Sequence, residues 1–377
     1  MDDSIPAKKR ILLLSAYHSA SHRYWCEGLI AAFPEYQWTL KTQPARHFAW
    51  RVYASGWIWS LAQDPDFHQP YDLILATSLV DIVALKATIR EFHQAPLWIY
   101  FHENQFAHPL GPNQRPEHQI RAQFKSLQNA FCADWITFNS RFNLETFFAG
   151  SRKLLRKFPE KLPGHPLQHL AHCSDVIPVP LNNTFRKLDS SPKIPGLIVW
   201  NHRWEWDKQP ERFISALNAL HHRSIDFKLA MLGIGGSSDH PLTQQTETIA
   251  PHILHWGQAD PETYQRFISQ ASIGVSTALH DFQGLAVLEL AQAGATVILP
   301  RRLAYPEVLP NAQFFSGSDQ DPAKDIEELT ETLASLLTQG PGSLKPAFHH
   351  SLPEWSTLRR TYQERIQTLL GAPLPPA

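Results

Sequence analysis

The sequence is short of cysteine, and this scarcity excludes one class of protein. Its 377 residues include only three cysteines, Cys26, Cys132 and Cys173, which lie far apart and without the spacing of metal ligands. A small secreted domain held together by disulfides would carry an even, clustered set. We therefore expect a protein of a reducing compartment, namely the cytoplasm.

Net charge and long apolar runs are also lacking. The 34 Lys and Arg residues balance 35 Asp and Glu residues to a formal charge of -1, which excludes a generally polybasic nucleic-acid or membrane binder. No segment approaches the roughly 18 apolar residues of a membrane-spanning helix, and the apolar run before Tyr17 is too short for a signal peptide. We expect no stable membrane association, and any anionic partner must bind a local surface.

Short apolar runs alternate with segments of helical periodicity, the pattern of βαβ units around a parallel sheet. A Pro-rich passage at 178–196 interrupts the alternation, which then restarts. The expected strands are 11–17, 37–42, 72–78, 96–101, 134–139, 196–202, 227–233, 272–277 and 295–300. The expected helices include 83–91, 116–131, 208–222, 261–271 and 284–293.

This pattern predicts an α/β fold with two doubly wound, Rossmann-like domains facing a central cleft. We expect an N-terminal domain over 1–185, a linker over 186–195 and a C-terminal domain over 196–353. The last segment, 354–377, has one apolar helical face, so we expect a closing helix that packs back on the N-terminal domain.

In open α/β sheets ligands bind at the carboxyl ends of the strands. After the strand at 196–202, the sequence NHRWEWDKQPE places Arg203 and Lys208 just before a helix. Two cations beside a helix N-terminus form a phosphate clamp. The alternative is a solvated loop in which Arg203 pairs with Glu205 or Asp207.

A second loop-to-helix segment is HDFQGLAVLELAQAG, residues 280–294. The amides of Gln283, Gly284 and Leu285 would point outward at the start of the helix and bind a pyrophosphate. Asp281 and Glu289 would accept hydroxyl hydrogen bonds from two parts of one ligand. The alternative is a helix cap by Asp281 with Glu289 on a wet face, although the apolar neighbours of Glu289 disfavour a purely solvated role.

In the N-terminal domain, the segment HENQFAHP after the strand at 96–101 places His102, Glu103 and Asn104 at a strand end. These side chains suit a polyhydroxylated substrate, and His102 suits proton transfer. We expect no metal, because helical HExxH spacing is absent. The loop at 18–25 offers Ser21 and His22 to the cleft, or else a helix cap by Ser19 or Ser21.

Basic residues concentrate in 141–187, with phenylalanines between them, a combination that suits a nucleic-acid backbone with stacked bases. The alternative is a helix with an aromatic core face and a solvated basic face. The segment contains only three acidic residues, Glu145, Glu160 and Asp175. Its eight basic residues are Arg141, Arg152, Lys153, Arg156, Lys157, Lys161, Arg186 and Lys187.

Six strings in this order resemble the tRNA-queuosine α-mannosyltransferase family of retaining GT-B glycosyltransferases. They are YFHENQFAHP, FNSRFNLETFF, PVPLNN, WNHRWEWDKQPE, HDFQGLAVLELAQAG and YPEVLP, and they extend from residue 100 to residue 310. The resemblance implies transfer of mannose, with retention, from GDP-mannose to a hydroxyl of the cyclopentenediol of queuosine, at the wobble position of aspartate tRNA. It implies GDP-mannose as donor substrate and no further cofactor.

The resemblance also implies roles for individual residues. Arg203 and Lys208 would neutralise the leaving diphosphate, while Asp281 would hold the hexose and Glu289 the ribose. His102 would lie beside the donor sugar. Gln283, Gly284, Leu285, Ser21 and His22 are expected to bind the donor, and Glu103, Asn104, Arg152, Lys153, Arg156 and Lys157 the acceptor.

One residue departs from the wider superfamily. Asp281 stands where that superfamily usually has Glu, which leaves the identity of the sugar open. The alternative functions are a GT-B enzyme with another nucleotide sugar or a lipid or polysaccharide acceptor, and a non-catalytic RNA-binding protein.

Overall fold

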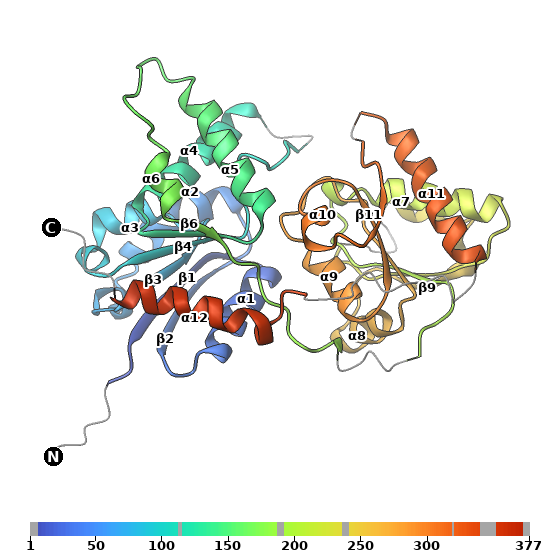
Figure 1. The fold of residues 1–377 in the computed structure, drawn as a ribbon, viewed down its shortest axis with the longest axis horizontal. Coiled ribbons are helices and arrows are strands. Elements are labelled where there is room, and N and C mark those ends of the chain that lie inside the picture. The colour runs from blue at the N-terminus through green and yellow to red at the C-terminus, as the bar shows by residue number, and fades with distance from the viewer. Residues whose placement is uncertain are drawn as a thin grey trace. The chain divides into compact units, whose positions relative to one another are not determined.

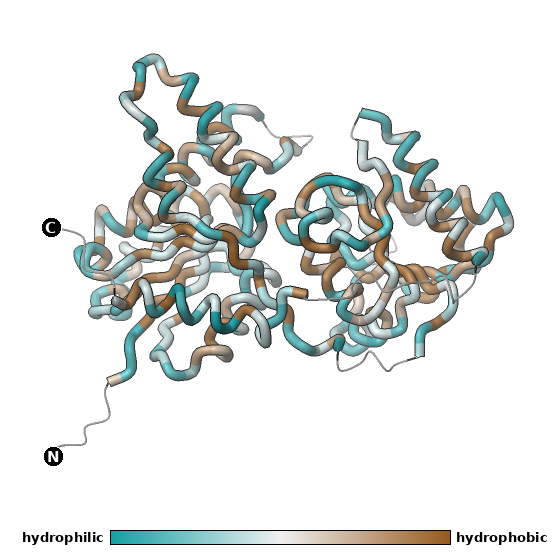
Figure 2. Tube along the Cα trace, in the orientation of Figure 1, coloured by the Kyte–Doolittle hydropathy of each residue, from teal (hydrophilic) through white to brown (hydrophobic). Residues whose placement is uncertain are grey.

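A computed structural model describes residues 7–111, 115–186, 192–235, 241–318, 320–339 and 352–371. The chain forms two compact units. Unit 1 comprises residues 1–180 and 355–377, and unit 2 comprises residues 181–354. Figure 1 shows an α/β sandwich in each unit, with helices on both faces of a central sheet. Strands of a parallel sheet that is covered on both faces are apolar along their length. Figure 2 shows this as hydrophobic positions concentrated along the strands.

Unit 1 contains a parallel sheet of six strands in the order β2-β1-β3-β4-β5-β6. Its strand order reverses between β1 and β3, where a doubly wound sheet binds ligands. The strands are β1 (Arg10–His18), β2 (Gln37–Pro44), β3 (Leu73–Thr77), β4 (Leu97–Phe101), β5 (Trp135–Phe138) and β6 (Ser174–Val176).

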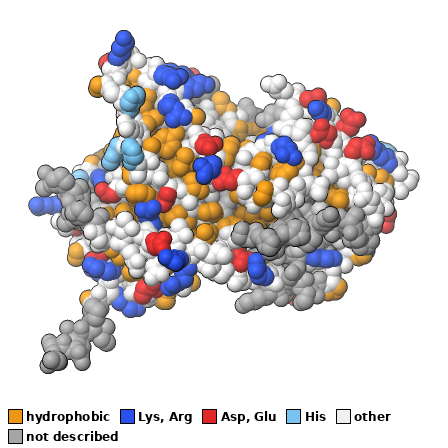
Figure 3. Space-filling view, in the orientation of Figure 1, with side chains coloured by type: hydrophobic (Ala, Val, Ile, Leu, Met, Phe, Trp, Pro, Cys, Tyr) orange, Lys and Arg blue, Asp and Glu red, His pale blue; other side chains and the backbone are white. Residues whose placement is uncertain are grey.

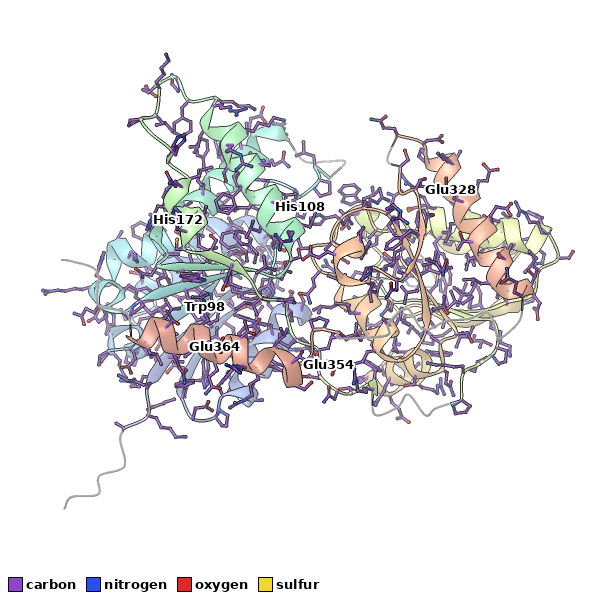
Figure 4. The ribbon with its side chains drawn as sticks, viewed as in Figure 1. Trp98, His108, His172, Glu328, Glu354 and Glu364 are labelled. Atoms are coloured by element: carbon purple, nitrogen blue, oxygen red, sulfur yellow. The ribbon has the colours of Figure 1, made fainter. Side chains whose placement is uncertain are left out.

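Helices cover both faces of this sheet. Those of unit 1 are α1 (Ala20–Ala32), α2 (Phe48–Leu61), α3 (Ile82–Thr88), α4 (Pro116–Cys132), α5 (Arg141–Leu155), α6 (Gln168–His172) and α12 (Trp355–Gly371). Helices α2 to α5 share one hydrophobic cluster with the sheet. On the other face Trp25 of α1 donates a 3.0 Å hydrogen bond to the hydroxyl of Tyr362 on α12. Trp98 of β4 lies beside α12 (Figure 4), with ring centroids 6.1 Å from Tyr362.

Unit 2 contains a second parallel sheet of six strands, in the order β12-β11-β10-β7-β8-β9. Read from β9, this is the Rossmann order, and the reversal lies between β7 and β10. The strands are β7 (Leu197–Trp200), β8 (Lys228–Met231), β9 (Ile253–Trp256), β10 (Ile273–Val275), β11 (Thr296–Pro300) and β12 (Gln313–Phe315). The helices are α7 (Pro210–His222), α8 (Pro261–Gln270), α9 (Leu285–Gln292), α10 (Tyr305–Val308) and α11 (Pro322–Thr338).

The division between the units falls at Pro180, whereas the sequence analysis placed the end of the first domain at residue 185. Leu181 forms a β-bridge with Glu354, and Phe185 is buried in a hydrophobic cluster of unit 2. Ile194 packs against the same cluster, so the flanks of the expected linker belong to unit 2. Residues 187–191 of that linker lie outside the described residues.

Some local expectations differ from the structure. Residues 20–25 form the first turns of α1, so the expected loop at 18–25 is wrong beyond Ser19. The sequence analysis also missed three strands, β6, β9 and β12, each of three or four residues. All three lie at sheet edges, where part of the strand is exposed. Among the described residues, no helix combines the length and apolarity that membrane crossing requires.

Candidate active site

Two loops meet at the strand-order reversal of unit 2. One follows β7 and the other follows β10, and backbone groups join them directly. Thr277 donates a hydrogen bond to the carbonyl of Lys208 at 2.8 Å, and the amide of Leu279 donates to the carbonyl of Asp207 at 2.7 Å. The two segments singled out from the sequence therefore form one continuous site at the carboxyl edge of this sheet.

Lys208 is the buried cation of this site. Its ammonium group donates to the carbonyl of His280 and lies 3.3 Å from a carboxylate oxygen of Asp207. Arg203, in contrast, is exposed and pairs with Glu205 at 2.9 Å, which is the internal pairing considered as the alternative to a phosphate clamp. Because an exposed pair contributes little, about 0–1 kcal/mol, Arg203 can leave Glu205 for an anionic ligand at small cost.

The start of α9 provides backbone amides beside Lys208. Gly284 has φ +79°, and a Cβ atom there would lie 2.8 Å from a ring carbon of Tyr305, so only glycine fits without strain. Asp281 accepts a 2.9 Å hydrogen bond from the amide of Gly284 and a 3.2 Å one from the Tyr305 hydroxyl. Asp281 thus fixes the turn that leads into this helix through the amide of the N-cap residue Gly284, and no side chain caps the helix itself. Gln283 is buried next to it, and Leu285 is the first helical residue.

Glu289 lies farther along α9 in a polar cluster that sequence reasoning did not assemble. The hydroxyl of Tyr264 on α8 donates to its carboxylate at 2.5 Å, and Asn201 donates to the Tyr264 oxygen at 3.0 Å. Burial raises the pKa of Glu289 to about 7. A carboxylate held this way is oriented for hydroxyl groups of a ligand rather than solvated on a wet face.

The sequence analysis assigned no individual role to four residues of this region. Asn201 and His202 directly follow β7, so their place at a strand end was the available signal. The His202 ring is buried and its Nε2 has no hydrogen-bond partner within the described residues. Burial lowers its pKa to about 3, so the ring is neutral. Tyr264 lies inside α8 and carried no sequence signal of its own, whereas Tyr305 begins α10 and belongs to the YPEVLP string, which gave it no individual role.

Two stacked histidines mark the carboxyl edge of the unit 1 sheet. The rings of His22 and His102 lie 4.3 Å apart, and the Trp25 ring meets the edge of His102 at 4.9 Å. Burial lowers the pKa of His22 to about 4 and that of His102 well below its usual value. Both rings are neutral near pH 7, and His102 Nε2 has no hydrogen-bond partner among the described residues. His102 therefore suits hydrogen bonding to a hydroxyl better than proton donation.

The assignment of Asn104 to acceptor binding needs correction. Asn104 is fully buried, and its amide nitrogen donates to Asn143 and Thr146 at 2.8 to 3.0 Å. Its oxygen accepts from the amides of Phe106 and Ala107 at 2.8 and 3.0 Å. With both ends occupied, Asn104 anchors the turn after β4 instead of contacting a ligand.

Glu103 and Ser21 remain accessible on the same edge of unit 1. Glu103 is partly exposed, and its backbone carbonyl accepts a 3.2 Å hydrogen bond from Ser78. Ser21 is exposed in the first turn of α1, with its hydroxyl 3.2 Å from that of Ser19. Within the described part of the chain, no three His, Cys, Asp or Glu side chains gather as a metal site would require.

A basic cavity lies at the C-terminal end of α5. It has a volume of about 1020 Å³ and is enclosed by α5, the segment that follows it and α6. Phe148, Leu155 and Phe158 contribute apolar walls; Arg152, Arg156 and Lys161 contribute cations. Figure 3 shows Lys, Arg and His side chains around the hydrophobic surface of this region.

The cations around the cavity have no acidic partners. Arg152, Lys153, Arg156, Lys157 and Lys161 are all exposed, and no ion pair within the described residues engages them. Cations at a helix C-terminus also interact favourably with the helix dipole, which accounts for part of their placement. Three of these cations line the cavity together with Glu145 and Glu160, and Lys153 and Lys157 lie beside it, so the end of α5 carries the positive surface that suits a nucleic-acid backbone.

Two family models match most of this chain. Residues 10–181 match the family model described as tRNA-queuosine alpha-mannosyltransferase N-terminal, and residues 196–339 match the model of glycosyl transferases group 1. A tRNA-queuosine alpha-mannosyltransferase of Drosophila melanogaster is 27% identical over 330 residues, which are 83% of this chain and 85% of the relative.

Solved structures resemble the whole chain. Sucrose-phosphate synthase from Thermosynechococcus elongatus has a TM-score of 0.64 at 13% identity, over 97% of this chain and all of its own. The trehalose-6-phosphate synthase OtsA has a TM-score of 0.63 at 12% identity, over 98% of this chain and all of its own. The resemblance carried by the six sequence motifs is confirmed. The chain is a hexosyltransferase of the GT-B fold, in which the N-terminal domain of the tRNA-queuosine alpha-mannosyltransferase family precedes a glycosyl transferases group 1 domain.

Proposed function

We propose that this enzyme transfers mannose from GDP-mannose to the cyclopentenediol of queuosine in tRNA(Asp), with retention of configuration. The observation that carries the acceptor is the match of residues 10–181 to the N-terminal domain of enzymes described as tRNA-queuosine mannosyltransferases. The three cysteines are free thiols, in keeping with a cytoplasmic location, where tRNA is available.

Unit 2 holds the donor in this proposal. Its buried Lys208 and the N-terminal end of α9, where the Gly284 amide is engaged by Asp281 and the Leu285 amide follows it, bind the diphosphate. Arg203 exchanges Glu205 for a phosphate oxygen. Glu289, oriented by Tyr264, accepts hydrogen bonds from the ribose hydroxyls. Asp281 meets the hexose with the carboxylate that also accepts from the Gly284 amide before α9. Cationic side chains and a helix terminus stand where other transferases use a metal ion.

The chemical step needs no covalent enzyme intermediate. A queuosine hydroxyl oxygen forms a bond to the anomeric carbon of mannose on the face that the leaving group vacates. The bond between that carbon and the diphosphate oxygen breaks, and the hydroxyl proton passes to the diphosphate oxygen. Lys208 and Arg203 stabilise the negative charge that develops on the departing GDP.

Unit 1 holds the acceptor. The accessible Glu103 supplies a hydrogen-bonding group for it at the carboxyl edge of the sheet, whereas the neutral His102, with His22 stacked upon it, serves the donor sugar. The cations Arg152, Lys153, Arg156 and Lys157 contact phosphates of the tRNA. Ser21, whose hydroxyl is exposed, is assigned to donor binding.

The test is nucleoside mass spectrometry of queuosine-containing tRNA after incubation with the purified protein and one nucleotide sugar. We expect a hexose on queuosine with GDP-mannose and none with UDP-glucose or UDP-galactose. Transfer from another donor would replace the donor assignment and direct attention to Asp281. No transfer from any donor would contradict the acceptor.

A further inference from the structure

Helix α2 carries an unusual concentration of exposed apolar side chains. Of the 13 large hydrophobic residues that are exposed in the described part of the chain, six lie on this one helix. Four of them, Trp50, Tyr53, Trp57 and Leu61, recur at spacings of three and four residues and so share one side of the helix. We call these four residues the aromatic face of α2.

The opposite side of α2 explains why the helix forms. Val52, Ser55, Gly56 and Trp59 are buried there, and a Cβ atom on Gly56 would lie 2.4 Å from the carbonyl oxygen of Asp81. The helix is thus tightly packed on unit 1, while Trp50 is 67% and Leu61 75% exposed and Tyr53 of the aromatic face donates a hydrogen bond to the His118 carbonyl of α4. Contiguous exposed apolar surface of this kind marks an interaction site.

The aromatic face begins next to the polar edge proposed to hold the acceptor. Helix α2 starts just after the carboxyl end of β2, and the Phe48 ring touches the ring of Tyr17 on β1 with centroids 5.6 Å apart. Strand β1 leads directly into α1, whose His22 stacks on His102. A ligand extending from His102 along this edge would therefore reach α2 within unit 1.

The charges around α2 favour an anionic partner. No Asp or Glu occurs between Tyr36 and Gln63. Arg46 precedes the helix. Burial raises the pKa of Tyr53, and the positive charge of Arg121 on the neighbouring α4 opposes that rise. Neither arginine has an acidic partner among the described residues. The nearest opposing charge on α4 is Glu117 in its first turn.

The geometry points to unpaired bases of the acceptor RNA as the occupant of the aromatic face. Flat indole and phenol rings flanked by arginines stack bases while the cations meet the phosphates. A lipid surface would require a cationic polar side on α2, yet that side is buried and Arg51 is hydrogen-bonded to the carbonyls of Pro44 and Arg46. The inference rests on the proposed function and names a second contact with its RNA substrate.

The test measures the affinity of the full chain for queuosine-containing tRNA at fixed salt. Trp50→Ala and Trp57→Ala should each weaken binding by about 5- to 150-fold, the range for loss of one stacked base. Trp50→Phe should retain most of the affinity, because a flat ring remains. Phe131→Ala is the matched control, since Phe131 is 48% exposed on α4 and outside the aromatic face. Thermal unfolding of each variant verifies that the fold is kept.

Two further measurements separate this inference from its rivals. Flotation with phosphatidylcholine and phosphatidylserine vesicles and sedimentation equilibrium report membrane binding and self-association. Unchanged tRNA affinity in both Trp variants overturns the inference, as does a loss confined to vesicle binding or self-association. The proposed function is tested independently by hexose transfer in the unaltered enzyme, so the failure of one is distinct from the failure of the other.

Discussion

The hydroxyl of Tyr264 donates a 2.5 Å hydrogen bond to the carboxylate of Glu289. The same hydroxyl oxygen accepts a 3.0 Å hydrogen bond from Asn201, so one side chain joins the loop after β7 to helices α8 and α9. This arrangement gives a buried carboxyl group a fixed orientation. Burial raises the pKa of Glu289 to about 7, although the hydrogen bond from Tyr264 favours the ionised form.

Binding of GDP-mannose should strengthen as pH rises from 6 towards 8. Ribose hydroxyls donate to the ionised carboxylate, so the ligand prefers the deprotonated form and its binding releases a proton below about pH 7. The limiting dependence is about tenfold in affinity per pH unit. Calorimetry in buffers of different ionisation enthalpy measures the proton release. Glu289→Gln should bind more weakly with a flat profile, and a flat profile in the unaltered enzyme would contradict the assignment.

Replacing Lys208 by Met should lower kcat by about 100- to 1000-fold, because the cation stabilises charge that develops on the leaving diphosphate. The matched control is Arg223→Met, which removes an exposed pair with Glu331 at the end of α7 and should leave turnover unchanged. Steady-state kinetics with tRNA and GDP-mannose measure kcat of both variants. A kcat within threefold of the unaltered enzyme would remove Lys208 from the chemical step.

Gly284→Ala should destabilise the start of α9. The positive φ and the overlap of a Cβ atom with the Tyr305 ring predict a loss of about 1–3 kcal/mol in the free energy of unfolding. Weaker binding of GDP-mannose should accompany it. Gly371→Ala is the control, because no atom lies within 4 Å of its added Cβ. Urea unfolding and donor titration test both, and equal stability of the two variants would contradict the prediction.

The cations at the C-terminal end of α5 should contribute to the salt dependence of tRNA binding. The double variant Arg152→Gln, Arg156→Gln should reduce the slope of log K against log salt concentration by about 1 to 2. Arg360→Gln is the control, since Arg360 already pairs with Glu364 at 2.8 Å on α12. Filter binding over a salt series supplies the slopes. Identical slopes in the double variant and the control would place the RNA backbone elsewhere.

Asn104→Ala should act on stability rather than on the acceptor. It removes hydrogen bonds to Asn143 and Thr146 and leaves the buried amides of Phe106 and Ala107 without an acceptor. We expect a loss of about 2–4 kcal/mol in urea unfolding, against no change for the exposed Gln128→Ala. Full stability combined with a raised KM for tRNA would restore Asn104 to acceptor binding.

The fully buried strands were predictable because of where they lie. Strands β3, β4 and β11 are buried along their whole length, so each appears as an unbroken apolar run. The short edge strands β6 and β12 have exposed or partly exposed residues and no such run. Their place in the sheet depends on backbone pairing with a neighbour, which leaves little trace in side-chain composition.

For the site, local positions were predictable and contacts between segments were not. The sequence alone determined which residues stand at strand ends and helix starts, including Lys208, Asp281 and Gly284, because those positions depend on local patterns. The tertiary structure decided their partners. The order of strands brings the loop after β7 against the loop after β10, 72 residues away, so that Lys208 reaches the carbonyl of His280. It also buried Asn104 against Asn143 and Thr146 of α5, because that contact depends on packing between segments that no local pattern encodes.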